Sequence, residues 1–213
     1  MAAARLQRST VHALFPTPVW EASLAPETYL PLNAAILRRL EALRQADVSA
    51  GTGWQSEVTL HRYEEVAPLL AAVERLARAV LEFLHIGNCG TPRVTGCWAN
   101  VNAPGAGHRV HAHPNNFLSG VYYVKVQPGA DTISFHDPRP QAAVLRPPVS
   151  ALSAENTDQV VVRVAEGTLL MFPSWLAHSV DANASGEARV SVSFNLMFPR
   201  FAETLAAPLW GEG

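Results

Sequence analysis

The sequence has little charge, little cysteine and no long apolar run, and each shortage excludes a class of protein. Only 16% of its 213 residues are charged, and the formal net charge is -2. No run of Lys or Arg offers a surface for nucleic acid or for an anionic membrane. No apolar stretch approaches the roughly 18 to 20 residues that a membrane span requires. We therefore expect a protein that works without nucleic acid and without a membrane.

The two cysteines and the first residues bear on the compartment. Cys89 and Cys97 lie at the edges of apolar segments rather than in a paired framework, so we interpret them as reduced thiols. Near the start of the chain, Arg5, Gln7 and Arg8 interrupt any apolar region of the kind that a signal peptide has. We expect a cytoplasmic protein.

The chain reads as one domain over residues 1–213, with helical support at about 29–86 and a β core at about 93–199. Apolar residues at spacings of three and four predict one amphipathic helix near residues 29–46 and a stronger one near residues 66–84. Before them, ALFPTPVWEASL predicts an edge strand, because its prolines cannot donate to a sheet ladder. We expect Trp54, in the link between the helices, to lie in the core.

After Arg93 the apolar pattern changes from helical spacing to alternation. It predicts strands near residues 94–101, 109–113, 118–126, 132–135, 160–164, 168–172 and 189–198. Turn sequences such as PGAG, HPNN and NASGE separate them. The predicted fold class is mainly β with flanking helices (α+β): a double-stranded β-helix core of the jelly-roll or cupin type, with the N-terminal helices packed on the outer face of a sheet.

Three histidines in this β region predict a metal site. His111 and His113 are two residues apart, so on an extended strand both imidazoles point to the same side. His178 follows a separate apolar strand and a Pro-Ser-Trp turn. Divalent transition metals accept imidazole readily, and three such ligands leave one face of an iron ion open to co-substrate and oxygen. The alternative is that these are structural histidines.

The last strand has one polar and one apolar face. Arg189, Ser191 and Asn195 lie on the polar face, which carries short hydroxyl and amide groups instead of the Lys and Glu of a solvated face. We expect the guanidinium of Arg189 to hold the carboxylate of an organic co-substrate, with Ser191 adding a hydroxyl donor. The alternative is a structural ion pair between Arg189 and an acid such as Asp131 or Asp137.

Several neighbours are weaker candidates. Tyr122 and Tyr123 point to opposite faces of their strand, so one lines the pocket and the other packs in the core. Alternation alone does not decide which, and we count Tyr122 among the cofactor-binding candidates. The amide of Asn100 either orients a ligand or caps a turn. His108 and His136 fall in loops, where a lone histidine is more often solvent-facing.

The connection from residue 136 to 159 is Pro-rich and long. Loops of this length in compact domains are usually lids or binding loops. We expect it to be a mobile lid over the pocket.

Several motifs in the right order resemble a known family. The strings are HAHPNNFLSGVYYV, FHDPRP, FPSWLAHSV and RVSVSFNL, together with LFPTPVW and GWQS. They resemble the 2-oxoglutarate-Fe(II) oxygenases, in a bacterial and phage branch near the prolyl-hydroxylase-like enzymes. The resemblance runs from about Leu14 to Phe198.

The resemblance implies Fe(II), 2-oxoglutarate and O2 as cofactors, and oxidation of a C–H bond coupled to formation of succinate and CO2. His111 stands where that superfamily has its first iron ligand, and His113 stands where it usually has an acid. His178 takes the place of the distal histidine, and Arg189 that of the residue binding the far carboxylate of 2-oxoglutarate. The substrate it implies is a small molecule, an amino acid or a peptide.

Two other functions stay open. Gly105, His111 and His113 follow the first cupin motif in part, and a three-histidine cupin can be a dioxygenase that uses no 2-oxoglutarate. A second alternative is a non-catalytic cupin-type module that binds a small molecule. The oligomeric state is open as well, with a homodimer among the arrangements.

Overall fold

Two helices and ten strands make up the computed structural model, which describes residues 7–46, 53–87, 90–139 and 147–199. The helices are α1 (Pro26–Gln45) and α2 (Ala67–Phe83), preceded in the latter case by two short 3-10 turns, Leu60–Arg62 and Glu64–Val66. The strands are β1 (Trp20–Ser23), β2 (Gly53–Gln55), β3 (Arg93–Asn102), β4 (His108–His111), β5 (Leu118–Lys125), β6 (Thr132–His136), β7 (Gln159–Arg163), β8 (Thr168–Pro173), β9 (His178–Val180) and β10 (Arg189–Met197).

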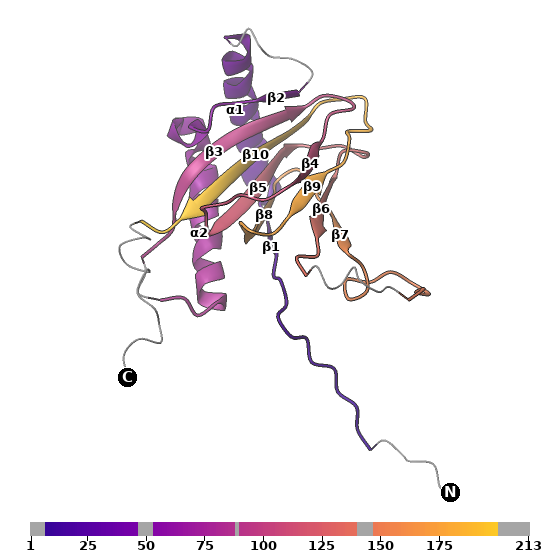
Figure 1. The fold of residues 1–213 in the computed structure, drawn as a ribbon. Helices are drawn as coiled ribbons and strands as arrows, with labels where there is room; N and C mark the ends of the chain where they lie inside the picture. Colours follow the sequence, from indigo (N-terminus) through magenta and orange to yellow (C-terminus); the bar gives the residue numbers. More distant parts are fainter. Residues whose placement is uncertain (1–6, 47–52, 88–89, 140–146, 200–213) are drawn as a thin grey trace, which may run out of the picture.

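The strands form two antiparallel sheets. The larger has the order β1-β8-β5-β10-β3-β2 and the smaller the order β4-β9-β6-β7. Both helices lie against the face of the larger sheet that is turned away from the smaller sheet (Figure 1). This arrangement confirms the predicted fold class. The two strands that the sequence pattern missed, β2 and β9, have only three residues each, too few to show alternation.

The larger sheet is buried on both faces, which explains the apolar composition of its central strands. Tyr122 and Leu169 pack with the helices in one apolar cluster. Their neighbours in sequence, Tyr123 and Leu170, pack in a second cluster between the two sheets. Trp54 is 7% exposed and belongs to the first cluster, as predicted. Within the described residues, no helix is long and apolar enough to cross a membrane.

The assignment of Tyr122 to cofactor binding is wrong. Its side chain is fully buried on the helix side of the sheet, where its hydroxyl donates to Asn33 Oδ1 at 2.7 Å. The Asn33 amide in turn donates to the backbone oxygen of Val124 at 2.8 Å, which ties α1 to β5. Tyr122 therefore holds a helix to the sheet, and Tyr123 faces the other sheet.

Removing this hydroxyl should destabilise the fold without touching the cofactor site. Tyr122→Phe leaves Asn33 Oδ1 buried without its donor, so we expect the free energy of unfolding to fall by about 1–3 kcal/mol. Urea denaturation measures the loss, and cofactor affinity should equal that of the parent. An unchanged unfolding midpoint would show that this buried hydrogen bond contributes no net stability.

Candidate metal centre and co-substrate cavity

The three histidines named from the sequence come together at the edge of the smaller sheet. β4 pairs antiparallel with β9, and His111 lies directly opposite His178. The ring centroid of His111 lies 4.4 Å from that of His178 and 5.1 Å from that of His113. One nitrogen from each ring lies within 4.8 Å of the other two. Three imidazoles at this spacing can share one metal ion.

Backbone carbonyls fix the orientation of two of these rings. Nδ1 of His111 lies 2.7 Å from the backbone oxygen of Arg109, and Nδ1 of His178 lies 2.9 Å from that of Leu176. Because a carbonyl oxygen only accepts, both rings carry their proton on Nδ1 and keep the Nε2 lone pair for a metal. His113 is held through its backbone, whose N–H donates to the backbone oxygen of Ser174 at 2.9 Å.

Burial keeps two of the imidazoles neutral. It lowers the pKa of His178 to about 4, against the opposing effect of the Leu176 carbonyl, and the positive charge of the neighbouring histidines acts in the same direction as burial. Burial and His111 likewise lower the pKa of His113 to about 4. A metal binds only the neutral imidazole, so these two rings are ready to bind a cation at neutral pH.

Within the described part of the chain, no Asp or Glu joins the three histidines. Asp137 is paired with Arg139 at 2.8 Å, and Asp131 is paired with Arg163 at 2.9 Å. The donor set is three neutral nitrogens, which fits a divalent transition metal such as Fe(II). Such a set leaves the full double positive charge on the ion.

Arg189 lies in the same cavity, at its buried end. The residue is 2% exposed, its Nε has no hydrogen-bond partner, and no described residue forms an ion pair with it. The structural ion pair with Asp131 or Asp137, considered as an alternative, is therefore absent from the described structure. A buried guanidinium without a counter-charge costs several kcal/mol, so the site is suited to an anionic ligand.

Tyr123 stands beside Arg189, with the guanidinium carbon 5.2 Å from the centre of its ring. Its hydroxyl is buried and has no hydrogen-bond partner. Burial raises the pKa of Tyr123 to about 12, although both the charge and the nearby N–H donors of Arg189 oppose this, so the phenol stays protonated and can donate. Arg189 and Tyr123 thus present two unused donors to the same space.

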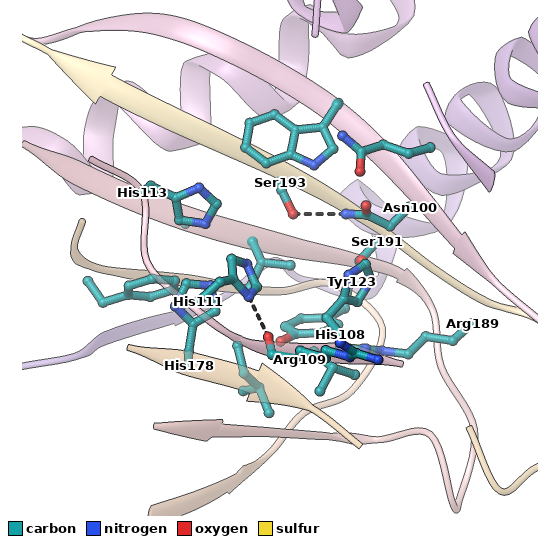
Figure 2. Close-up of a pocket in the computed structure, with 17 residues that line it drawn as sticks. Asn100, His108, Arg109, His111, His113, Tyr123, His178, Arg189, Ser191 and Ser193 are labelled. Atoms are coloured by element: carbon teal, nitrogen blue, oxygen red, sulfur yellow. Dashed lines mark hydrogen bonds between the residues drawn. The ribbon is translucent and has the colours of Figure 1, made fainter. Parts of the chain in front are cut away.

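A cavity of about 420 Å³ joins the histidines to Arg189. Figure 2 shows His111, His113 and His178 on one side of it, and Arg189, Tyr123 and Ser191 on the other. This volume lies within the range of small-molecule sites. A small dicarboxylate lying between the two groups would meet a metal at one end and a guanidinium at the other.

The other predicted residues of the last strand divide into two groups. Ser191 lines the cavity, and so does Asn100, whose amide donates to Ser193 Oγ at 3.0 Å. Asn195 does not line it and instead accepts from the Ser119 hydroxyl at 2.7 Å. The cofactor-binding assignment of Asn195 is wrong because β10 runs on past the cavity.

His108 lines the cavity, contrary to the expectation that it faces solvent. The reason is a bulge: three steps along β4, from His108 to His111, match two along β9, from Val180 to His178. Both histidines therefore point inward, and His108 Nε2 lies 3.1 Å from the Asn102 amide nitrogen and 3.3 Å from its oxygen. The alternation of apolar and polar residues in the sequence does not reveal such a bulge.

The lining residues that the sequence analysis did not name as site residues include Gln55, Trp98 and Arg109. Gln55 comes from the three-residue strand β2, which has no pattern of its own. Trp98 could have been found from its place on the same strand face as Asn100.

The predicted lid contributes nothing to the cavity wall among its described residues. Residues 137–139 and 147–158 do not line the cavity, and residues 140–146 lie outside the described structure. Asp137, which begins the loop, holds Arg139 instead of facing the histidines. The lid stays a prediction.

Comparison with known proteins agrees with this geometry. Residues 96–195 match the family model described as "Putative 2OG-Fe(II) oxygenase". This region contains His111, His113, His178 and Arg189. This region of the chain is therefore similar to the 2OG-Fe(II) oxygenase family, whose cofactors are Fe(II) and 2-oxoglutarate.

Solved structures share the fold at low sequence identity. A prolyl-4-hydroxylase of Pseudomonas putida is 19% identical, with a TM-score of 0.59 over 86% of this chain and 94% of its own. HygX of Streptomyces hygroscopicus, crystallised with nickel and 2-oxoglutarate, is 12% identical, with a TM-score of 0.61 over 87% and 84%. AviO1 of Streptomyces viridochromogenes is 17% identical, with a TM-score of 0.59 over 86% and 91%. No curated protein matches the chain in sequence.

Removing single histidines tests the metal centre. We expect His111→Ala and His178→Ala to lose Fe(II) on desalting, because each removes one of three ligands, whereas His113→Asp keeps the ion by substituting a carboxylate ligand. Metal analysis after anaerobic loading measures retention. His136→Ala is the matched control, since His136 bonds to Ser179 away from the cluster. Parental iron content in both alanine variants would refute the ligand assignment.

The buried imidazoles also predict how stability depends on pH. The pKa of His113 and His178 is near 6.5 when the chain is unfolded and about 4 when it is folded. The unfolded state therefore binds more protons between these values, and the metal-free protein should lose stability as the pH falls from about 6.5 to about 4. Thermal unfolding across this range measures the slope. His178→Gln should flatten it, and a level profile in the parent would contradict the prediction.

Proposed function

We propose that this chain is a Fe(II)- and 2-oxoglutarate-dependent oxygenase that oxidises a C–H bond of a small molecule, an amino acid or a peptide, with hydroxylation as the reaction type. One observation carries the proposal: a buried, unpaired Arg189 opens into the same cavity as three converging histidines. A cofactor with a metal-chelating end and a distant carboxylate matches both features. We also propose that the chain works as a single domain of this kind.

In this proposal His111, His113 and His178 hold the iron through Nε2. Bound iron and 2-oxoglutarate supply oxygen activation, in which a C–H bond of the substrate is oxidised while 2-oxoglutarate and O2 give succinate and CO2. The chain's own residues position the reactants. The carbonyls of Arg109 and Leu176 keep two ligand rings in place, and each ring would hold the ion through its free Nε2.

Arg189 has the second task, which is to orient 2-oxoglutarate. Its guanidinium can make two parallel charge-assisted bonds to the distal carboxylate. Tyr123, protonated because its pKa is raised to about 12, can donate a further bond, and Ser191 stands two residues along the same strand face. Binding a carboxylate here relieves the cost of the buried charge, so the cavity favours a dianion over a neutral molecule of similar size.

The affinity for 2-oxoglutarate tests the function. We expect Arg189→Ala to weaken it by about two to four powers of ten, because each charge-assisted bond contributes roughly 1.5–3 kcal/mol. Arg189→Lys should recover only part, since a point charge cannot reproduce the planar fork. Titration of the iron-loaded, oxygen-free protein measures both, and iron content should stay constant.

Arg163→Ala serves as the matched control, because Arg163 pairs with Asp131 on the surface of β7. The parent should also convert 2-oxoglutarate to succinate in the presence of O2. If the parent binds no 2-oxoglutarate, or if Arg189→Ala binds it as tightly as the parent, a three-histidine dioxygenase without 2-oxoglutarate becomes the better account.

A further inference from the structure

The cavity has a closed end and an open end. Arg189, Tyr123 and Ser191 at the closed end are each less than 5% exposed. Elsewhere the wall contains His111 and Gln55, which are exposed. If 2-oxoglutarate spans the distance from the metal to Arg189, a second organic substrate has to occupy the open end.

The charge of the wall restricts what can bind there. In the described part of the chain the cavity lining contains two arginines and four histidines, and no aspartate or glutamate. His113 adds no negative charge, whereas a carboxylate ligand in its place would add one. The two positive charges of Fe(II) would therefore be balanced only by the two negative charges of 2-oxoglutarate. The positive charges of Arg189 and Arg109 then remain.

Arg109 contributes one of these charges at an exposed position of the cavity wall. The residue lines the cavity and is exposed, and no described residue forms an ion pair with it. Its backbone oxygen is the acceptor for His111, so its main chain is fixed two residues from a proposed metal ligand. A cationic substrate would meet repulsion here and no counter-charge.

Trp98 offers a flat apolar surface beside the metal centre. The indole is half-buried, lines the cavity and lies 5.7 Å from the ring of His113, centroid to centroid. Aromatic faces favour planar or apolar groups. A substrate that stacks on Trp98 would hold its carbon skeleton next to the metal.

We propose that the primary substrate is a small organic anion, with its acidic group at the open end near Arg109 and a flat or apolar part against Trp98. This deepens the proposed function and rests on it. The shared chemistry is an oxyanion, so carboxylates and phosphates both qualify.

Four probes that share a phenyl ring test the inference: the anions benzoate and phenyl phosphate, the neutral benzamide and the cation benzamidinium. Titration calorimetry on protein already saturated with Ni(II) and 2-oxoglutarate keeps the probes away from the metal and Arg189. We expect at least one of the two anions to bind about tenfold or more tightly than benzamide, and benzamidinium to bind most weakly. The preference for the anion should shrink as salt is added. Comparing benzoate with phenyl phosphate identifies which acidic group the site prefers.

Variants locate the binding. Arg109→Gln should lower the affinity for the anion by about tenfold and leave the affinity for benzamide unchanged, whereas Trp98→Ala should lower both affinities. Arg163→Gln is the control for loss of a surface arginine. Equal or tighter binding of benzamide or benzamidinium, or no binding of any probe, overturns the inference. The affinity for 2-oxoglutarate, measured on the same Ni(II) protein, separates this result from failure of the proposed function.

Discussion

The pairing of β4 with β9 is the constraint on which the rest of the site depends. It sets His111 opposite His178, although the two residues are far apart in the sequence. The backbone carbonyls of Arg109 and Leu176 then fix the two rings and leave Nε2 of each free. The bulge in β4 turns His108 inward as well. The larger sheet, packed on the two helices, supplies the rigid wall against which this edge is held (Figure 1).

A second consequence of the two-sheet architecture is the buried charge on β10. Arg189 lies between the sheets, where it is almost fully buried and no described acid compensates it. An anion bound in the cavity would offset this cost. Tyr123 adds a hydroxyl that stays protonated. In the proposed function, binding of the co-substrate would therefore also stabilise the fold at this strand.

The proposed ligand set would give the cavity a particular electrostatic character. Three neutral imidazoles leave more positive charge on a metal than two imidazoles and a carboxylate do. The absence of acids from the described cavity wall extends the same bias to the open end. Arg109 and Arg189 favour anions in this space, so the proposed co-substrate and the proposed substrate class follow from one charge distribution.

Local chemistry in the sequence determined which residues were candidates for the site: His111, His113 and Arg189 stand out because imidazole suits a transition metal and a planar guanidinium suits a carboxylate. Periodicity likewise determined the helices and most strands, since burial on one face is a local pattern. Only the tertiary structure decided that Tyr123 and not Tyr122 faces the cavity, because both faces of β5 are apolar and alternation cannot tell them apart. It also decided the inward turn of His108, since a bulge depends on the pairing partner, and pairing is a contact between segments distant in the chain.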